Sequence, residues 1–423
     1  MQSHPIGTGA DRGIERRAPA MTLTAEPQHH LDNAEIVAAI MRKLESVADD
    51  LKAEAAETEE TQKLTDRAIE LLLETGVTRV FLPKELGGLG LFPGEALPIL
   101  DRVAQIDGSI GWVNTIFAAG GHMIDYLEYD PARAIIDSGE PLFGAVSNGA
   151  ATAVAVEGGW KLTGSYRYAS GSKHTRFIFT PARKIVNGEP VEGPPAMFAV
   201  PTSEIAYGGG WDTIGLRGTG SVDFTFTDVF VPAAHEAVVL GAPILGGDEA
   251  LGGVGLLIPL MHLGFATGIT RRILDDAASN ASRPPSRPGA RRQADSDRFR
   301  TEYAQQEMKA QAARALVTEV LADIDDTLRE GCGLSRTQTS MLMGANIHAH
   351  DVAREIAEWA YRRGGGITLR AGDTQRAIRD ALAGVQHFIV DDSHMVNVGW
   401  DLLGAPANYI WMGPTFGPIP GTE

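Results

Sequence analysis

Apolar residues recur with helical spacing through the first third of the chain. Ile36, Ile40 and Leu44 fall on one stripe of a predicted helix, with charged residues on the opposite face. The segment TDRAIELLLETG predicts a second helix, which begins at a Thr or Asp cap and ends at Gly76. The pattern therefore predicts a helical region over residues 31–140.

From about residue 141 to 235 the pattern changes to alternation. The segment ATAVAVEGGWKLTGSYRYA predicts two strands joined at Gly158-Gly159, which is typical of a hairpin. In SVDFTFTDVFVP, Val222, Phe224 and Phe226 alternate with polar residues, as in a strand with one buried face. Gly and Pro recur between these runs, and together they favour a small sandwich or barrel.

Helical periodicity returns in the last part of the chain. Long amphipathic helices are predicted over TEYAQQEMKAQAARALVTEVLADIDDTL and TQTSMLMGANIHAHDVAREIAEWAYRR. The segment RDALAGVQHFIVDDSHMVN (residues 379–397) predicts a further helix, on which Asp380, His387 and His394 are spaced seven residues apart. Seven residues make nearly two turns, so these side chains are expected on one face. Several long helices with short connections predict a bundle.

Composition excludes several classes of protein. The single cysteine, Cys332, rules out an internal disulfide, and a net charge of −17 argues against a nucleic-acid partner. Residues 1–30 lack an apolar segment of signal-peptide length and are expected to form a disordered leader. The uncharged run Leu251–Thr270 is interrupted by glycines, Pro259 and His262, which favours a buried helix over a membrane span. We therefore expect a cytoplasmic protein with no membrane segment.

Two short patterns bear on nucleotide and metal binding. GLRGTGS precedes a predicted strand and lacks the G-x-G-x-x-G order, so it does not predict a Rossmann site. It is either a tight turn or a loop that lets backbone and hydroxyl groups approach a flat cofactor, with Trp211 as the stacking partner. His348 and His350 point about 200° apart on a helix, and no metal site is predicted.

Longer motifs occur in a fixed order along the chain, and together they resemble the acyl-CoA dehydrogenase superfamily. The resemblance is closer to its oxygenase branch, the two-component flavin-dependent monooxygenases, and it spans roughly residues 31–404. The motifs are FLPKELGGLGL (81–91), DGSIGW (107–112), WKLTGSYRYASGSKHTRF (160–177), WDTIGLRGTGSVDF (211–224) and RDALAGVQH (379–387).

The resemblance implies an α+β fold that is mostly α. It implies an N-terminal helical domain at 31–140, a middle β-domain at 141–245, and a C-terminal four-helix bundle with a tail at 246–423. The bundle of such a protein is expected to assemble a homotetramer.

Flavin contacts follow from the same resemblance. Trp211 matches a tryptophan that packs on the isoalloxazine, and Ser170 matches a serine that hydrogen-bonds the flavin near N5. Asn148 and Thr219 are further cofactor contacts, and Arg370 is a candidate for binding the phosphate anion. Six arginines between Arg283 and Arg300 predict either a solvated loop or a phosphate site that reaches a neighbouring subunit.

The expected catalytic residues separate the two branches of the superfamily. A dehydrogenase needs a carboxylate base, but Phe388 stands at one expected position and the first bundle helix has no Glu. The oxygenases instead keep a histidine seven residues after the Asp of the RD motif, and His387 matches it. An imidazole that titrates near neutrality is expected to hold or supply a proton to the flavin C4a-peroxide. His122 is a candidate substrate base or hydrogen-bonding group.

The resemblance thus implies the oxygenase component of a two-component monooxygenase. It would oxygenate a small aromatic or heterocyclic substrate with O2 and reduced FMN or FADH2, supplied by a separate NAD(P)H-dependent flavin reductase. The sequence leaves open oxidation at carbon, sulfur or nitrogen. One alternative is an acyl-CoA dehydrogenase or a nitroalkane-oxidase-like flavoenzyme. The non-enzymatic alternative is a flavin-free homologue that acts as a binding protein.

Overall fold

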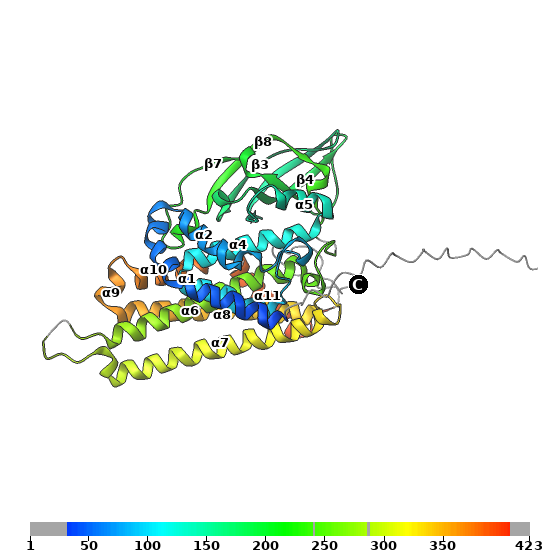
Figure 1. The fold of residues 1–423 in the computed structure, drawn as a ribbon. Helices are drawn as coiled ribbons and strands as arrows, with labels where there is room; N and C mark the ends of the chain where they lie inside the picture. Colours follow the sequence, from blue (N-terminus) through cyan, green and yellow to red (C-terminus); the bar gives the residue numbers. More distant parts are fainter. Residues whose placement is uncertain (1–31, 240–241, 286–287, 407–423) are drawn as a thin grey trace, which may run out of the picture.

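The computed structural model describes residues 32–239, 242–285 and 288–406. The predicted leader and the residues after 406 therefore lie outside the described part of the chain. Figure 1 shows the strands gathered on one side of the helices, with α4 between the sheet and the bundle and α7 on the far side. The first helices are α1 (Asn33–Thr61), α2 (Asp66–Thr75), α3 (Pro93–Ile106), α4 (Gly108–Met123) and α5 (Tyr129–Asp137).

The N-terminal helices form where the sequence predicts them. Ile40 and Leu44 are buried on the inner stripe of α1. The Thr65 hydroxyl accepts a hydrogen bond from the Ala68 N–H and caps the start of α2, while Gly76 ends that helix with φ +82°. The apolar stripe packs against α3 and α4, and this contact fixes the position of α4 beside the sheet.

The strands form one sheet in the order β7-β8-β3-β2-β4-β6-β9, with β1 and β5 also paired to β4. The predicted hairpin is present, and its turn is at Glu157-Gly158, because Val156 pairs with Gly159. Val222, Phe224 and Phe226 are buried along β8, as the alternation predicts. The strands are β1 (Phe143–Ala145), β2 (Gly149–Val156), β3 (Gly159–Ala169), β4 (Phe177–Val186), β5 (Glu189–Pro190), β6 (Ala196–Pro201), β7 (Ala206–Gly208), β8 (Val222–Pro232) and β9 (Glu236–Ala237).

The C-terminal part is a bundle in which α6 packs against α3 and α8. Within the described residues, only the segment Asp248–Ser282 is long and apolar enough to cross a membrane, and 72% of its apolar window is buried inside the protein. This agrees with the buried helix predicted from the sequence. The bundle helices are α6 (Gly253–Ser282), α7 (Asp297–Arg329), α8 (Arg336–Gly364), α9 (Gly366–Leu369), α10 (Asp373–Gly384) and α11 (Asp392–Leu402).

The prediction of a single helix over residues 379–397 is wrong. Helix α10 ends at Gly384, a short 3-10 turn follows at Phe388–Val390, and α11 begins at Asp392. The Asp391 carboxylate accepts the Ser393 N–H and so starts a new helix. Because the chain changes direction here, Asp380, His387 and His394 do not share one helical face.

Candidate active site

Helix α4 places Trp112 between the sheet and the bundle. The Asp107 side chain caps this helix by accepting the N–H groups of Ser109 and Ile110 at 3.0 and 3.2 Å. Trp112 is 6% exposed, and its Nε1–H donates to the Ser170 hydroxyl at 3.2 Å. Ser170 directly follows β3, so the end of that strand and α4 meet at one buried hydrogen bond.

Ser170 begins a line of polar groups that we call the hydroxyl chain: Ser170, Ser221, Thr219, the Leu216 carbonyl and Trp211. The Ser170 and Ser221 hydroxyls are 2.5 Å apart, and those of Ser221 and Thr219 are 2.7 Å apart. The Thr219 hydroxyl donates to the Leu216 carbonyl at 2.7 Å. The Trp211 Nε1–H donates to the same carbonyl at 2.8 Å. The fold therefore brings Ser170, at the end of β3, together with two predicted flavin contacts of the loop before β8, Trp211 and Thr219.

On the bundle side of Trp112 lies a histidine cluster made of His262, His350 and His387. The His262 ring centroid is 4.1 Å from that of His387 and 4.9 Å from that of Trp112. His350 lies 5.9 Å from His262, and Trp112 lies 5.6 Å from His387. In the sequence, His387 is marked by its motif, whereas His262 stands out only as an interruption of an apolar run. His262 and His387 are far apart in the chain, so their ring contact cannot be predicted from a local sequence pattern.

The histidine cluster is electrically neutral. Burial lowers the pKa of His387 to about 3, with His350 adding to the shift, and lowers the pKa of His350 to about 4. Burial also lowers the pKa of His262 well below its ordinary value. The prediction that His387 titrates near neutrality is therefore wrong. Its buried site has no nearby carboxylate among the described residues, and burial disfavours the charged form.

Hydrogen bonds also assign the tautomers. The His387 Nδ1 accepts the Ile389 N–H at 3.4 Å, so neutral His387 carries its hydrogen on Nε2. The His350 Nδ1 lies 2.9 Å from the Asn346 carbonyl and must donate to it. Within the described residues, the buried His262 Nδ1 and His350 Nε2 have no hydrogen-bond partner. Such atoms are normally satisfied by a bound molecule or water.

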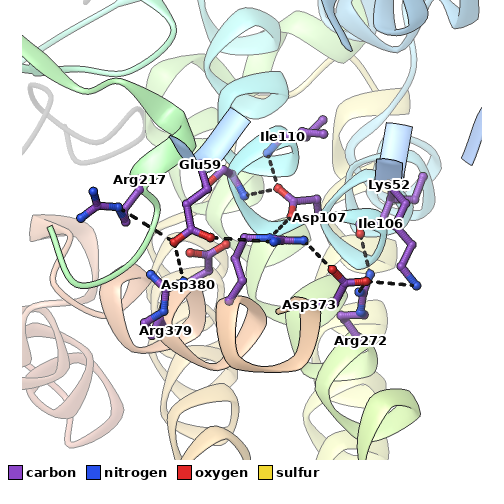
Figure 2. A network of polar contacts seen from close by, with 12 residues as sticks. Lys52, Glu59, Ile106, Asp107, Ile110, Arg217, Arg272, Asp373, Arg379 and Asp380 are labelled. Carbon is purple, nitrogen blue, oxygen red and sulfur yellow. Dashed lines mark hydrogen bonds and ion pairs between the residues drawn. The ribbon is translucent and has the colours of Figure 1, made fainter. Parts of the chain in front are cut away.

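A network of charged side chains contacts the hydroxyl chain at the Leu216 peptide. We call it the charge network, and its members are Glu59, Asp107, Arg376, Arg379 and Asp380. Figure 2 shows Glu59, Asp107, Arg379 and Asp380 close to one another where α1, α4 and α10 meet the loop that carries Arg217. The Arg376 Nε donates to Asp107 at 3.0 Å, and Arg379 pairs with Glu59. The Asp380 carboxylate accepts the Leu216 N–H at 2.6 Å. Burial and the nearby Asp107 charge raise the pKa of Asp380 well above its usual range.

The other predicted site residues lie elsewhere. His122 is buried further along α4, where its Nδ1 is 2.8 Å from the Asp125 carboxylate. Asn148 is exposed in the turn before β2, and Arg370 is exposed after α9. The hydrogen bonds and ring contacts of the described residues do not link these three to the hydroxyl chain or the histidine cluster.

Arginines of the segment 283–300 pair with acids in the loop before α7 and in the first turns of that helix. Arg292 pairs with Asp295 at 3.0 Å, and Arg298 pairs with Glu302 at 2.9 Å. These exposed pairs agree with the solvated-loop alternative and leave the phosphate alternative as a prediction. Asp275 and Asp276, at the far end of α6, are paired with Arg271 and Arg272 and so are not free bases.

The site fits a flat, hydrogen-bonding cofactor such as flavin. It offers the half-buried Trp211 ring, a line of hydroxyl groups, and neutral imidazoles with unsatisfied nitrogens. Trp112 connects the two sides through its contacts with Ser170 and with His387. No carboxylate contacts Trp112 or His387 through the described hydrogen bonds and ring contacts, which separates this site from one built for proton abstraction by Glu.

Comparisons with known proteins agree with this architecture. The family model for the acyl-CoA dehydrogenase C-terminal domain matches residues 260–392. Indole-3-acetate monooxygenase of Pseudomonas putida is 28% identical over 402 residues, which cover 92% of this chain and 96% of that protein.

The flavin-dependent monooxygenase oxygenase subunit HsaA of Mycobacterium tuberculosis is 28% identical over 202 residues, which cover 46% of this chain and 49% of that protein. Its crystal structure matches with a TM-score of 0.78 at 22% identity, covering 89% of this chain and 98% of that one.

XiaF from Streptomyces sp., solved with FADH2 and glycerol, matches with a TM-score of 0.79 at 20% identity over 90% of this chain and 98% of that one. The predicted fold class is thus confirmed. The chain is similar to the acyl-CoA dehydrogenase family in its C-terminal domain, and over most of its length to an oxygenase of the flavin-dependent monooxygenases.

Proposed function

We propose that this protein is the oxygenase component of a two-component flavin-dependent monooxygenase. The observation that carries the proposal is the pairing of the hydroxyl chain with a neutral histidine cluster across Trp112. Bound reduced flavin would supply the electrons that activate O2. A dehydrogenase would need a carboxylate base at the same place, where this chain has Phe388 and His387.

Each residue of the site has a role in this proposal. The Trp211 ring would stack on the flavin, and the Ser170 and Thr219 hydroxyls would hydrogen-bond its polar edge. The His387 Nε2–H would donate a hydrogen bond toward the place where oxygen reacts. Because His387 is neutral, it would orient the reacting oxygen by a hydrogen bond and would not act as a strong acid. A strong acid at this place would promote release of hydrogen peroxide.

The substrate is proposed to be a small aromatic or heterocyclic molecule. Trp112, Phe265 and the histidine rings form an aromatic group on the bundle side. The name of the Pseudomonas relative, indole-3-acetate monooxygenase, supports the same class. His122, oriented by Asp125, would act on a polar group of the substrate.

A separate flavin reductase is the proposed partner, since the related HsaA is named an oxygenase subunit. Reduced FMN and FADH2 are both proposed as cofactors, and XiaF was solved with FADH2. We also propose a cytoplasmic homotetramer. Large apolar side chains exposed on the bundle helices support self-association: Met308, Tyr361, Leu402 and Leu403.

The test is anaerobic binding of reduced FMN and of FADH2, followed by mixing with oxygenated buffer and a panel of indoles and phenols. We expect reduced flavin to bind more tightly than oxidised flavin, and we expect an oxygenated product with little hydrogen peroxide. A tightly held oxidised flavin that an acyl-CoA reduces directly would contradict the proposal and favour a dehydrogenase.

A further inference from the structure

Leu216 occupies a backbone conformation that its side chain disfavours. It has φ +53° and ψ +32°, in the left-handed region, although it is a large residue rather than glycine. It is 5% exposed, and its side chain packs in the same apolar core as Trp112. A conformation of this kind persists only where the surroundings hold it in place, and such residues concentrate at functional sites.

Three side chains hold the backbone of Leu216. Its carbonyl accepts both the Trp211 Nε1–H and the Thr219 hydroxyl, at 2.8 and 2.7 Å. Its N–H donates to Asp380 at 2.6 Å, from a residue 164 positions away in the chain. The two groups on the carbonyl belong to the predicted flavin contacts. Asp380 acts from the opposite side, on helix α10.

The surroundings show that α10 and the loop are closely fitted. A Cβ on Gly215 would lie 2.1 Å from the Arg379 carbonyl, and a Cβ on Gly108 would lie 2.6 Å from an Asp380 oxygen. The Arg379 guanidinium also donates to the Ile214 carbonyl at 2.9 Å. Glycine is therefore required at both approaches, and Asp380 is enclosed between α4, α10 and the loop.

Burying the carboxyl group of Asp380 costs free energy. It is 1% exposed, and within the described residues its second oxygen has no hydrogen-bond partner. It also lies near the Asp107 carboxylate, with Arg376 and Arg379 as the neighbouring cations. Among the described residues, the only hydrogen bond to this side chain comes from the Leu216 N–H, so holding that N–H is the role that accounts for its burial.

We propose that Asp380 is a positioning residue for the flavin site: by holding the Leu216 N–H, it fixes the peptide that orients Trp211 and Thr219. This rests on the proposed function, because the groups it orients are the proposed flavin contacts. If the hydrogen bond from Leu216 to Asp380 were lost, the Leu216 peptide would move. Thr219, Ser221 and Ser170 would then move with it, since each is hydrogen-bonded to the next.

The test compares three variants with the wild type. Asp380→Ala removes the acceptor. Asp380→Asn keeps a carbonyl oxygen at the same position and should rescue. Asp373→Ala is the matched control, because the half-exposed Asp373 pairs with Arg376 in the same region at 2.9 Å but does not contact Leu216. All three are first checked for folding by circular dichroism and thermal unfolding.

The first readout is amide hydrogen exchange at Leu216 in the flavin-free protein. Loss of a hydrogen bond to a carboxyl group should speed exchange by about tenfold or more in Asp380→Ala, while Asp380→Asn and Asp373→Ala stay near the wild type. The wild type supplies a test of its own, which holds even if Asp380→Ala does not fold. Fast, unprotected exchange at Leu216 in the wild type would overturn the inference.

The second readout is the dissociation constant for reduced FMN and FADH2 under anaerobic conditions. We expect binding about tenfold weaker in Asp380→Ala and near wild-type in the other two variants. Equal flavin affinity in a folded Asp380→Ala protein would overturn the inference. If the wild type itself binds neither reduced flavin, the proposed function fails, while the exchange data still report whether Asp380 holds Leu216.

Discussion

The charge network contacts the hydroxyl chain at Leu216, and the histidine cluster lies against Trp112. The two bury polar groups in opposite ways. In the charge network, Arg376 and Arg379 each pair with an acid, and Asp380 binds a backbone N–H. In the histidine cluster the side chains stay neutral, and His262 and His350 keep nitrogens with no partner among the described residues. Buried charges need partners, whereas neutral imidazoles can remain available for a ligand.

This difference indicates a division of labour. Ion pairs and backbone hydrogen bonds hold the loop of residues 215–221 in place, where a fixed geometry is needed. The neutral cluster lies on the side where oxygen is proposed to react, and there a strong acid would be harmful.

The largest expected effect is loss of stability in acid. The folded-state pKa of His350 is about 4, below its ordinary value of 6.5, so the unfolded state binds more protons between these values. The stability that neutral His350 contributes is fully present above pH 6.5 and is lost as the pH falls through 4. At about 1.36 kcal/mol per unit, this one group accounts for roughly 3 kcal/mol, and His262 and His387 act in the same direction.

Denaturant unfolding between pH 4 and 7.5 measures this effect. Burial raises the pKa of Asp125 and of Asp325 to about 6 and also raises the pKa of Asp380, so these three groups act in the opposite direction over this range. The comparison is therefore with His350→Asn, which keeps a donor near the Nδ1 position. We expect the variant to lose part of the acid sensitivity. An identical pH slope in both proteins would show that the pKa of His350 is not lowered in the folded state.

The next effect concerns His387 and the coupling of flavin oxidation to product. His387→Asn keeps an acceptor for the Ile389 N–H but removes Nε2, whereas His387→Gln can place a donor near Nε2. We expect the Asn variant to fold and bind reduced flavin, and its coupled oxygenation to fall by about 10²-fold, with hydrogen peroxide released instead. The Gln variant should recover part of the coupling.

The measurement is the ratio of product to hydrogen peroxide per flavin oxidised, followed from pH 6 to 8.5. Because burial lowers the pKa of His387 to about 3, the wild-type ratio should show no transition from His387 in this range. If the Asn variant couples normally, His387 only caps the turn at Phe388–Val390.

A smaller effect is expected for Trp211 on the geometry side. Trp211→Ala removes a stacked ring and should weaken binding of reduced flavin by about 1 kcal/mol beyond the lost area, or roughly fivefold. Trp211→Phe keeps a ring face but loses the hydrogen bond to the Leu216 carbonyl, so it should lie between the two. Titration of reduced flavin under anaerobic conditions decides this, and equal affinity in all three proteins would assign Trp211 to packing alone.

Some parts of the fold and of the site were predictable from the sequence, and others were not. Ile40 and Leu44, and the alternating Val222, Phe224 and Phe226, were predictable because each element buries one face. Motif resemblance brought Ser170, Thr219 and Trp211 into one site. The role of Asp380 was not predictable, because its partner is a backbone N–H in a loop 164 positions away.

The break after α10 was missed for a related reason. The seven-residue spacing from Asp380 to His387 and on to His394 continues the helical pattern across a segment that is not one helix. The Asp391 cap that starts α11 is a local cue, but the spacing of the histidines outweighed it. His262 was missed because α6 is apolar on nearly all faces, so its pattern does not mark which side faces a site.

The smallest expected effect concerns His262, and it asks whether the unpartnered nitrogen exists for function. His262 is 4% exposed, and its buried Nδ1 has no hydrogen-bond partner among the described residues. Replacing such a group by an apolar one of similar volume removes a desolvation penalty. We therefore expect His262→Leu to be as stable as the wild type or up to about 1 kcal/mol more stable in the absence of flavin, as denaturant unfolding would show.

Function should move in the other direction, because His262 packs against His387 with ring centroids 4.1 Å apart. We expect His262→Leu to bind reduced flavin normally but to release a few-fold more hydrogen peroxide per product. His235→Leu is the control: its buried Nδ1 also lacks a partner among the described residues, but its ring packs on Phe177 in the β-domain. A gain in peroxide release with His262→Leu alone would tie the unpartnered nitrogen to oxygen chemistry. Equal behaviour of the two variants would make His262 an ordinary buried histidine, and neutrality of the cluster would then rest on His350 and His387.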